Sequence, residues 1–240
     1  MRIAANTIAY NDEGLIRGCI ESVKPYVEEH VVVIGDKPYF GEPQPPDKTK
    51  EIAEDLGALV INGVFPMDHD QRNVGLNFLE SQDYDWILGV DSDHWMTEKD
   101  MGILLNHLSE TSADAILMPQ VSYWHDTDHV LVGDEFLPVI AIRPHVRYAY
   151  IANVDHPCEI LDTCVVHHLC WGWPKDIYKK VTCYPHAPEF DGKTWYKENY
   201  LTWKEGEPAR LPTGDLQTKK QSLPEELQKY LPLKYAQASL

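Results

Sequence analysis

The chain has 240 residues, of which 43% are hydrophobic and 25% are charged. This length and balance are typical of a globular protein with one large domain, or one domain with an appendage, and exclude a disordered or membrane-embedded chain. The formal net charge of −17 disfavours nucleic acid as a partner, because no run of lysine and arginine offsets it. A divalent cation can still bring an anionic nucleotide into an acidic cleft.

The sequence also bears on the compartment. Its apolar runs are too short to span a bilayer, and residues 1–6 lack the long apolar core of a signal peptide. Five cysteines, an odd number without a Cys-x-x-Cys pair, favour reduced thiols over a disulfide framework. We therefore expect no membrane span and a cytoplasmic location.

The N-terminal half alternates short apolar runs with segments of helical periodicity. In chain order we predict a strand over 2–10, a helix over 15–23, a strand over 30–34, a helix over 47–56, a strand over 59–61, a helix over 71–81 and a strand over 86–90. This alternation implies parallel strands joined by right-handed crossovers, with helices on both faces. The predicted fold class is α/β, with a doubly wound, mostly parallel sheet.

The second half is less regular. After a helix over about 98–109 and a strand over 115–118, we expect irregular β structure through residue 155. Beyond residue 194 the chain is polar, and only a short helix near 224–230 is predicted. Between the N-terminal elements, the loop from Pro38 to Asp47 holds four prolines, and we expect it on the surface near the nucleotide-binding edge.

These patterns suggest one domain with an extension. We predict a domain over residues 1–190, divided into a nucleotide-binding half, 1–110, and an acceptor and metal half, 111–190. An irregular C-terminal extension over 191–240 is expected to pack on this domain.

Asp91-Ser92-Asp93 follows the apolar run Trp86 to Val90 directly. Two carboxylates at the end of a buried strand form a hard-oxygen site, suited to Mg²⁺ or Mn²⁺ carrying a diphosphate. Ligand sites of open α/β sheets lie outside the carboxyl ends of such strands. Asp-x-Asp recurs at 68–70, 83–85 and 126–128 without a preceding strand, and there a turn or solvated loop is the expected structure.

Four signals occur in a characteristic order along the first 110 residues: Ile3 to Glu13, Val31 to Asp36, Asp70 to Gly75, and the Asp91/Asp93 strand. In this order they resemble the family 2 glycosyltransferases of the GT-A fold. The resemblance implies a GT-A-like, Rossmann-like fold. It also implies metal-dependent transfer of a sugar from a nucleotide-sugar, with a UDP-sugar favoured, to a hydroxyl acceptor, with inversion.

The resemblance implies roles for the nucleotide-binding residues. Tyr10 and Asn11 match the end of the first strand, where the family packs the nucleotide base. Asp36 matches the acidic residue that bonds the uracil or a neighbouring group, and Arg72 matches a basic residue near the ribose and diphosphate. Simpler roles stay open: Asp36 in a turn, Asn11 as a helix N-cap, and Arg72 in an exposed pair with nearby aspartates.

The same resemblance implies a metal site. Asp93 matches the direct metal ligand, and Asp91 lies nearer the ribose or a metal-bound water. The segment His168 to Trp171 resembles the family's His-Leu-Ser-Trp-like segment, whose histidine completes the metal shell. The resemblance therefore implies His168 as a metal ligand, and His167 is the second choice for this ligand. An imidazole beside carboxylates favours Mn²⁺ over Mg²⁺.

A structural zinc site is a competing interpretation of this region, because cysteine and histidine are dense there. The possible ligands are His156, Cys158, Cys164, His167, His168, Cys170, Cys183 and His186. Their spacings fit no standard zinc module.

Inverting sugar transfer needs a general base to take the proton of the acceptor hydroxyl. The candidates are Asp155, Asp134-Glu135 and Glu159, and we favour Asp155 ahead of Glu135 as catalytic residue. Related enzymes often carry a His-Glu pair near Asp155, where this chain has a His-Pro pair. A capping or salt-bridge role is the alternative for each.

Trp171 and Trp173 are predicted to contact the sugar or the acceptor, because aromatic rings stack on the apolar faces of sugars.

Two other classes of function stay open. A sugar nucleotidyltransferase would want a glycine-rich, basic loop for triphosphate, which Asn6 to Gly14 does not provide. A non-catalytic carbohydrate- or nucleotide-binding protein is the other. The acceptor could be a glycan, a lipid-linked group or a protein, with DNA disfavoured by the charge.

Overall fold

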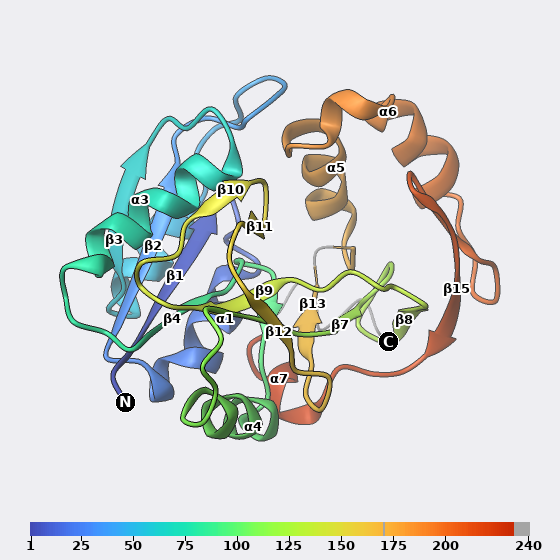
Figure 1. Ribbon diagram of the computed structural model, residues 1–240. Helices are drawn as coiled ribbons and strands as arrows, with labels where there is room; N and C mark the ends of the chain where they lie inside the picture. Colours follow the sequence, from blue (N-terminus) through green and yellow to red (C-terminus); the bar gives the residue numbers. More distant parts are fainter. Residues whose placement is uncertain (170, 233–240) are drawn as a thin grey trace.

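The computed structural model describes residues 1–169 and 171–232, and its centre is a seven-stranded sheet (Figure 1). In spatial order the strands are β12 (Cys158–Ile160), β6 (Ala115–Leu117), β9 (Val139–Ile142), β4 (Trp86–Gly89), β1 (Ile3–Ala9), β2 (Glu29–Gly35) and β3 (Leu59–Gly63). β1 is parallel to β2 and β4, and β2 to β3, whereas β9 runs antiparallel to β4 and β6. The predicted α/β fold with a mostly parallel sheet is confirmed.

Helices of the N-terminal half cover both faces of this sheet. They are α1 (Ile16–Val23), with the short η1 (Lys24–Tyr26) after it, α2 (Thr49–Asp55) and α3 (Asp68–Glu80). Successive residues of β2 point to opposite faces. Val31 and Val33 join one apolar cluster with α3, whereas Val32 and Ile34 join another with α1 and α2. Both sides of β2 are therefore buried, which explains its continuous apolar sequence.

The predicted helices and strands of this half agree closely with the structure, and the main difference lies at the start of α3. This helix begins at Asp68 rather than at Gln71, so the Asp-x-Asp copy at 68–70 is the first turn of a helix and not a loop. Acidic side chains are favoured there because the helix dipole is positive at its N-terminus. The helix predicted over 98–109 is α4 (Glu98–Leu108), which Thr97 caps.

α3 lies very close to β1. A Cβ atom on Gly75 would come within 1.9 Å of Asn6 Oδ1, so only glycine allows this approach. Asn6 Nδ2 in turn donates a hydrogen bond to Arg72 O at 2.9 Å. These contacts fix Arg72 beside the central strand.

The β-rich region predicted up to residue 155 supplies β9 to the central sheet, and its other strands belong to smaller sheets. β10 (Tyr148–Tyr150) and β11 (Asn153–Val154) pair with each other. β13 (Val166–His168) lies between β5 (His94–Trp95) and β7 (Gln120–Ser122). In this sheet His168 pairs with His94 on one side and with Ser122 on the other. Two segments that are far apart in the sequence therefore meet next to the loop after β4.

The C-terminal region has more regular structure than the sequence predicted. Its elements are α5 (Pro174–Cys183), η2 (Ala187–Glu189), α6 (Gly192–Trp195), η3 (Tyr196–Tyr200), β14 (Ala209–Leu211), β15 (Gly214–Lys220) and α7 (Glu225–Gln228). Only α7 corresponds to a predicted element. β15 was missed because it is a polar strand, and it forms by pairing antiparallel with β8 (His129–Val132). Within the expected extension, β15 thereby joins residues 214–220 to residues 129–132 by strand pairing.

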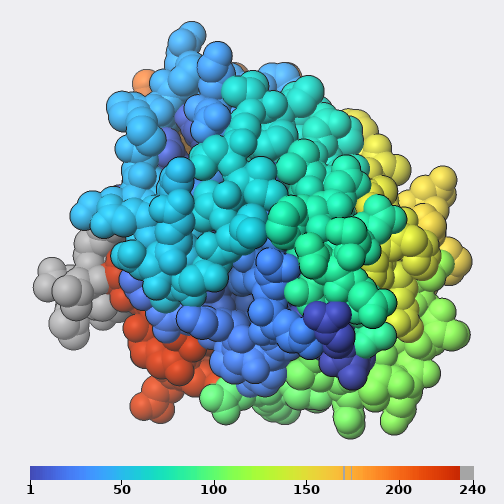
Figure 2. Space-filling model, turned by 90° about the vertical axis from the view of Figure 1, so that its left-hand side faces the viewer, coloured from blue at the N-terminus to red at the C-terminus, as the bar shows by residue number. Residues whose placement is uncertain are grey.

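The chain then returns to the N-terminal half. Leu223 and Leu227 share an apolar cluster with Leu15, and the Tyr230 ring meets the Trp95 ring edge-on at 6.1 Å between centroids. Figure 2 shows this last segment, in red, lying against the blue N-terminal elements. Residues 233–240 of the expected extension lie outside the described residues. Among the helices described, none combines the length and apolar character needed to cross a bilayer.

Candidate active site

A cavity of about 540 Å³ opens at the carboxyl ends of β1 and β4. One wall comes from the N-terminal half, and the facing wall comes from α5 and the segments that follow it. The polar lining includes Tyr10, Tyr39, Asp68, Arg72, Asp91, Ser92, Asp93, His94, Gln120, Asp134, His168 and Lys180. The position agrees with the rule that open α/β sheets bind ligands at this edge.

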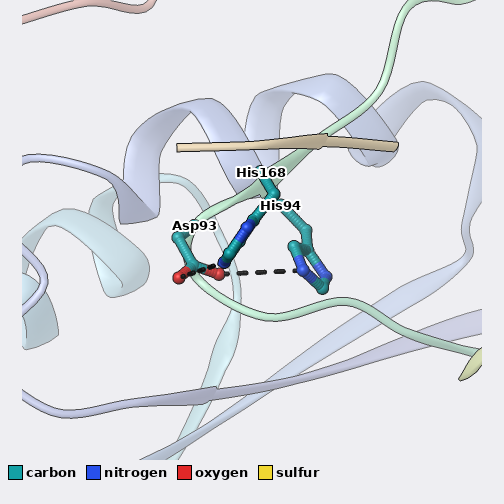
Figure 3. A group of neighbouring side chains, drawn as sticks. All are labelled: Asp93, His94 and His168. Atoms are coloured by element: carbon teal, nitrogen blue, oxygen red, sulfur yellow. Dashed lines mark ion pairs between the residues drawn. The ribbon is translucent and has the colours of Figure 1, made fainter. Parts of the chain in front are cut away.

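Asp93, His94 and His168 form a tight group in this cavity (Figure 3). Asp93 Oδ2 lies 3.5 Å from His168 Nε2, and Asp93 Oδ1 lies 3.9 Å from His94 Nε2. One ligand atom from each residue lies within 4.8 Å of the others, and all three residues are buried. One carboxylate and two imidazoles suit a divalent transition-metal ion such as Mn²⁺.

The small sheet explains why these residues meet. Pairing of β13 with β5 places His168 opposite His94, and Asp93 immediately precedes β5. His168 Nδ1 lies 2.9 Å from Ser122 Oγ, which holds the ring with Nε2 toward Asp93. Asp93 and His168 were predicted from the sequence, whereas His94 was not, although it is the next residue after the motif.

Asp91 is not part of the Asp93–His94–His168 group and pairs with Arg72 instead. Arg72 donates two hydrogen bonds to its carboxylate, from Nη1 at 2.5 Å and from Nη2 at 2.9 Å. The guanidinium also lies 5.1 Å from the centroid of the Tyr148 ring, and its Nε lies 3.6 Å from Asp68 Oδ2. Arg72 is therefore a buried group of the cavity wall, whereas the alternative in the sequence analysis was an exposed pair.

The charges of this group fit cation binding. Burial raises the pKa of Asp93, but His168 and, to a smaller extent, His94 lower it. Their combined effect is larger than that of burial, so the pKa lies well below its usual value. For Asp91, burial also raises the pKa, and Arg72 and His94 outweigh it, so the net shift is downward. Burial lowers the pKa of His94 to about 4. At neutral pH the carboxylates are thus ionised and the His94 imidazole is neutral, as metal ligands must be.

The other predicted nucleotide-binding residues lie in different places. Tyr10 lines the cavity, and its hydroxyl accepts a hydrogen bond from Gln44 N at 3.0 Å. Asn11, at φ 54°, donates from Nδ2 to Pro45 O at 3.0 Å, so it holds the proline-rich loop. Asp36 is exposed, accepts a hydrogen bond from Asn62 Nδ2 at 3.3 Å, and is outside the cavity lining.

Neighbouring residues on β13 face opposite ways, as in any strand. His167 therefore turns away from Asp93, and its Nδ1 lies 2.9 Å from the Tyr123 hydroxyl. Among the predicted aromatic residues, Trp171 lines the cavity, whereas Trp173 is buried in the main apolar cluster. The structure brings His168 and Trp171 to the site and leaves His167 and Trp173 outside it.

The two favoured catalytic carboxylates, Asp155 and Glu135, are exposed and are outside the cavity lining. Asp134, next to Glu135, lies inside it. Its Oδ2 accepts hydrogen bonds from Ser122 Oγ at 2.6 Å and from Gln120 Nε2 at 2.9 Å.

The residues of the competing zinc interpretation do not gather in one place within the described part of the chain. Cys164 is buried beside Met118, and Cys183 is buried on α5. His186 and Glu189 are exposed residues of the cavity lining, and their Nδ1 and Oε1 atoms are 2.7 Å apart. Cys170 lies outside the described residues.

α5 supplies two lysines that the sequence analysis missed. Lys179 is buried, and its Nζ donates to Asp12 Oδ1 and, at 3.0 Å, to Asn11 O. Ser92 Oγ donates to the other oxygen of Asp12 at 2.7 Å, so this carboxylate links α5 to the loop after β4. Lys180 Nζ lies 3.3 Å from His168 Nε2. The apolar pair at Ile177 and Val181, one helical turn apart, was the available signal for α5.

The comparisons with solved structures concern the fold. Glucosyl-3-phosphoglycerate synthase from Mycobacterium tuberculosis, in complex with Mn²⁺, UDP and phosphoglyceric acid, has a TM-score of 0.50 and 15% identity, covering 92% of this chain and 87% of that chain. The complex of the same enzyme with Mg²⁺ and UDP also has a TM-score of 0.50. Its sequence identity is 14%, and the match covers 93% of this chain and 87% of that chain.

A further structure, residues 1–349 of S. aureus TarS, has a TM-score of 0.49 and 16% identity, covering 75% of this chain. This chain spans only 63% of the length of that one. No curated protein matches the sequence significantly. At such identities the structural likeness concerns the fold alone, and the predicted GT-A-like fold is confirmed.

The sequence itself is more specific. It matches the family model described as "Glycosyl transferase family 2" over residues 7–166. The matched segment carries Arg72, Asp91, Asp93 and His94, and it ends just before His168. The chain therefore belongs to glycosyl transferase family 2.

Proposed function

We propose that this protein is a glycosyltransferase that depends on a divalent cation and moves a sugar from a nucleotide-sugar, preferably a UDP-sugar, to a hydroxyl acceptor with inversion. The main support is the Asp93–His94–His168 group beside the Arg72–Asp91 pair, within one cavity at the carboxyl ends of β1 and β4. Two structures of similar fold are complexes with UDP and Mn²⁺ or Mg²⁺, which supports this choice of donor and cation.

The residues present fit such a cation. Asp93, His94 and His168 offer a carboxylate oxygen and two ring nitrogens that already face one another. A bound Mn²⁺ or Mg²⁺ would neutralise the negative charge that develops on the leaving diphosphate. Lys180, whose Nζ lies 3.3 Å from His168 Nε2, adds a positive charge on the same side of the cavity.

The remaining lining residues would position the donor. Tyr10, at the end of β1, and Tyr39, in the loop after β2, both line the cavity, and we place the nucleotide base there. Arg72 holds the Asp91 carboxylate in a fixed orientation, and we assign Asp91 to the ribose. Trp171 lines the opposite side and offers its ring to a sugar.

Asp134 is our candidate for the general base, because it is a carboxylate of the cavity lining outside the cation group. Ser122 Oγ donates to Asp134 and also contacts His168 Nδ1. A single hydroxyl thus connects the base to the cation site, which keeps both at the place of reaction. Asp155 and Glu135, both exposed, stay predictions.

The first test is a thermal-shift screen of UDP- and GDP-sugars with and without Mn²⁺, followed by an assay of transfer and donor hydrolysis. Ligand at about 100 times its Kd should stabilise the protein by about 2.7 kcal/mol. This gain should vanish in Asp93→Ala and persist in Asp70→Ala, which removes a partly exposed carboxylate outside the cavity lining. If no nucleotide-sugar stabilises the protein in the presence of metal, the proposal is wrong. Binding without turnover would instead indicate a non-catalytic binding protein.

The base assignment has its own matched pair of variants. Asp134→Asn should lower kcat by about 10²- to 10⁴-fold and leave Mn²⁺ affinity unchanged. Glu135→Gln, at the exposed neighbouring position, should leave kcat near the wild-type value. The opposite ranking would assign the base to Glu135.

A further inference from the structure

Three metal-ligating side chains meet on the surface, at the sheet edge opposite the active-site cavity. Asp114 precedes β6, His145 follows β9, and His156 precedes β12. β6 is antiparallel to β9 and parallel to β12, so all three positions fall at the same edge. This edge holds the amino ends of the strands parallel to β4, whereas the cavity lies at their carboxyl ends.

We propose that Asp114, His145 and His156 form a zinc-binding site. Asp114 Oδ1 lies 3.5 Å from His145 Nε2, and Asp114 Oδ2 lies 3.6 Å from His156 Nδ1. With metal–ligand bonds of about 2.0 to 2.2 Å, two ligands of a tetrahedral zinc ion are roughly 3.3 to 3.6 Å apart. Each imidazole nitrogen lies at this spacing from one oxygen of the Asp114 carboxylate, His145 from Oδ1 and His156 from Oδ2.

The two imidazoles complete the geometry. Their ring centroids are 5.6 Å apart and the rings meet edge to face, at 68°. One ligand atom from each of the three residues lies within 4.8 Å of the others, so small side-chain rotations would close the group around an ion. Two imidazole nitrogens and a carboxylate oxygen are a ligand set that zinc accepts, with water in the fourth position.

The backbone holds the three segments in place. Asp114 N donates to Pro157 O at 3.3 Å, and Arg143 N donates to Asp114 O at 2.8 Å. The side chains of Asp114, His145 and His156 are 30%, 59% and 34% exposed, so an ion can reach them from solvent. A bound ion would cross-link the amino ends of β6 and β12 to the loop after β9, and so stabilise β12, whose three residues are exposed.

The test is calorimetric titration with ZnCl₂ in an Asp93→Ala background, which weakens zinc binding in the cavity. We expect one zinc ion per chain at this surface group, with micromolar or tighter affinity and a rise in melting temperature. His145→Ala and His156→Ala should each weaken zinc binding by about 100-fold, because each removes one of three protein ligands. His186→Ala, at an exposed histidine of the active-site cavity, should leave the affinity of the surface group unchanged.

Cys158 needs a separate variant, because its exposed thiol lies nearby and donates to His156 O at 3.2 Å. Zinc binding that survives Cys158→Ser would support the proposed ligands, whereas binding lost in this variant would assign the ion to the thiol and overturn the proposal. The proposal is also wrong if zinc binding is absent, or if it is unchanged in His145→Ala. Equal melting temperatures of all variants without zinc establish that each one folds. The site is independent of the proposed transferase activity.

Discussion

Arg72 donates hydrogen bonds from both terminal nitrogens to the Asp91 carboxylate, from Nη1 at 2.5 Å and from Nη2 at 2.9 Å, and so connects α3 to the loop after β4. The arginine is 6% exposed, and a second carboxylate, Asp68, lies beside it. Burial raises the pKa of Asp68, although Arg72 opposes this shift. The guanidinium therefore compensates two acidic groups in the wall of the cavity.

Arg72→Ala should lower the free energy of unfolding by about 3 kcal/mol, because it leaves neighbouring carboxylates without their cation. The free energy of unfolding of Arg72→Lys should lie between those of wild type and Arg72→Ala, since an ammonium group keeps the charge but not the paired hydrogen bonds. Arg17→Ala is the matched control: Arg17 bonds Glu21 one turn away on the exposed side of α1, and its loss should cost only about 0.5 kcal/mol. Urea unfolding measures all three variants, and equal losses for Arg72→Ala and Arg17→Ala would contradict the compensating role.

The pair of Lys179 and Asp12 joins α5 to the loop after β1. Both are almost fully buried, and the pKa of Lys179 is raised because Asp12 and Asp176 outweigh the lowering effect of burial. Lys179→Met should cost about 3 to 5 kcal/mol, since it removes the ammonium group that pairs with the buried Asp12 carboxylate.

Lys175→Met is the control for this pair. Lys175 Nζ lies 3.4 Å from Glu13 Oε1, but its side chain is 51% exposed, so the loss should stay below about 1 kcal/mol. Hydrogen exchange should show faster opening of α5 in Lys179→Met alone. Unchanged exchange in that variant would mean that the buried pair does not anchor the helix.

Gly75→Ala should destabilise the protein by about 1 to 3 kcal/mol, because the added Cβ meets Asn6 Oδ1 at 1.9 Å and Val33 Cγ2 at 3.0 Å. Movement of α3 would also displace Arg72 and weaken donor binding. Gly102→Ala, on α4 with nothing within 4 Å of the new Cβ, should instead stabilise by up to about 1 kcal/mol. Thermal unfolding gives the sign of each change, and the same sign for both would refute this packing argument.

His30 should make stability depend on pH. Burial lowers its pKa from 6.5 to about 3, and its Nε2 lies 2.8 Å from Thr7 Oγ1. Below the usual pKa the unfolded chain binds a proton that the folded chain does not, so stability falls as the pH falls. Between pH 7 and pH 5, wild type should lose about 2 kcal/mol more than His30→Gln.

Urea unfolding at the two pH values measures this difference. Between pH 7 and pH 5, the His186→Gln variant, changed at an exposed histidine, should lose as much free energy of unfolding as wild type does. If His30→Gln also followed wild type, His30 would not be the group responsible.

The local sequence was sufficient for much of the fold. Apolar runs and helical spacing predicted the strands and helices up to α4, because each depends on its own residues and on burial between two layers. The same reasoning placed Asp91 and Asp93 at the end of β4, since parallel strands end at one edge of the sheet. It failed for β15, whose polar sequence becomes a strand only by pairing with β8.

The composition of the site was decided by contacts between distant segments. The register of β13 against β5 turns His168 toward Asp93 and His167 away from it. Folding of the second half places Asp134 in the cavity and its neighbour Glu135 outside. The sequence by itself determined the layered fold, the family and the acidic motif, because these follow from local pattern. Only the tertiary structure decided which side chains converge on the motif, because strand register and long-range packing set their directions.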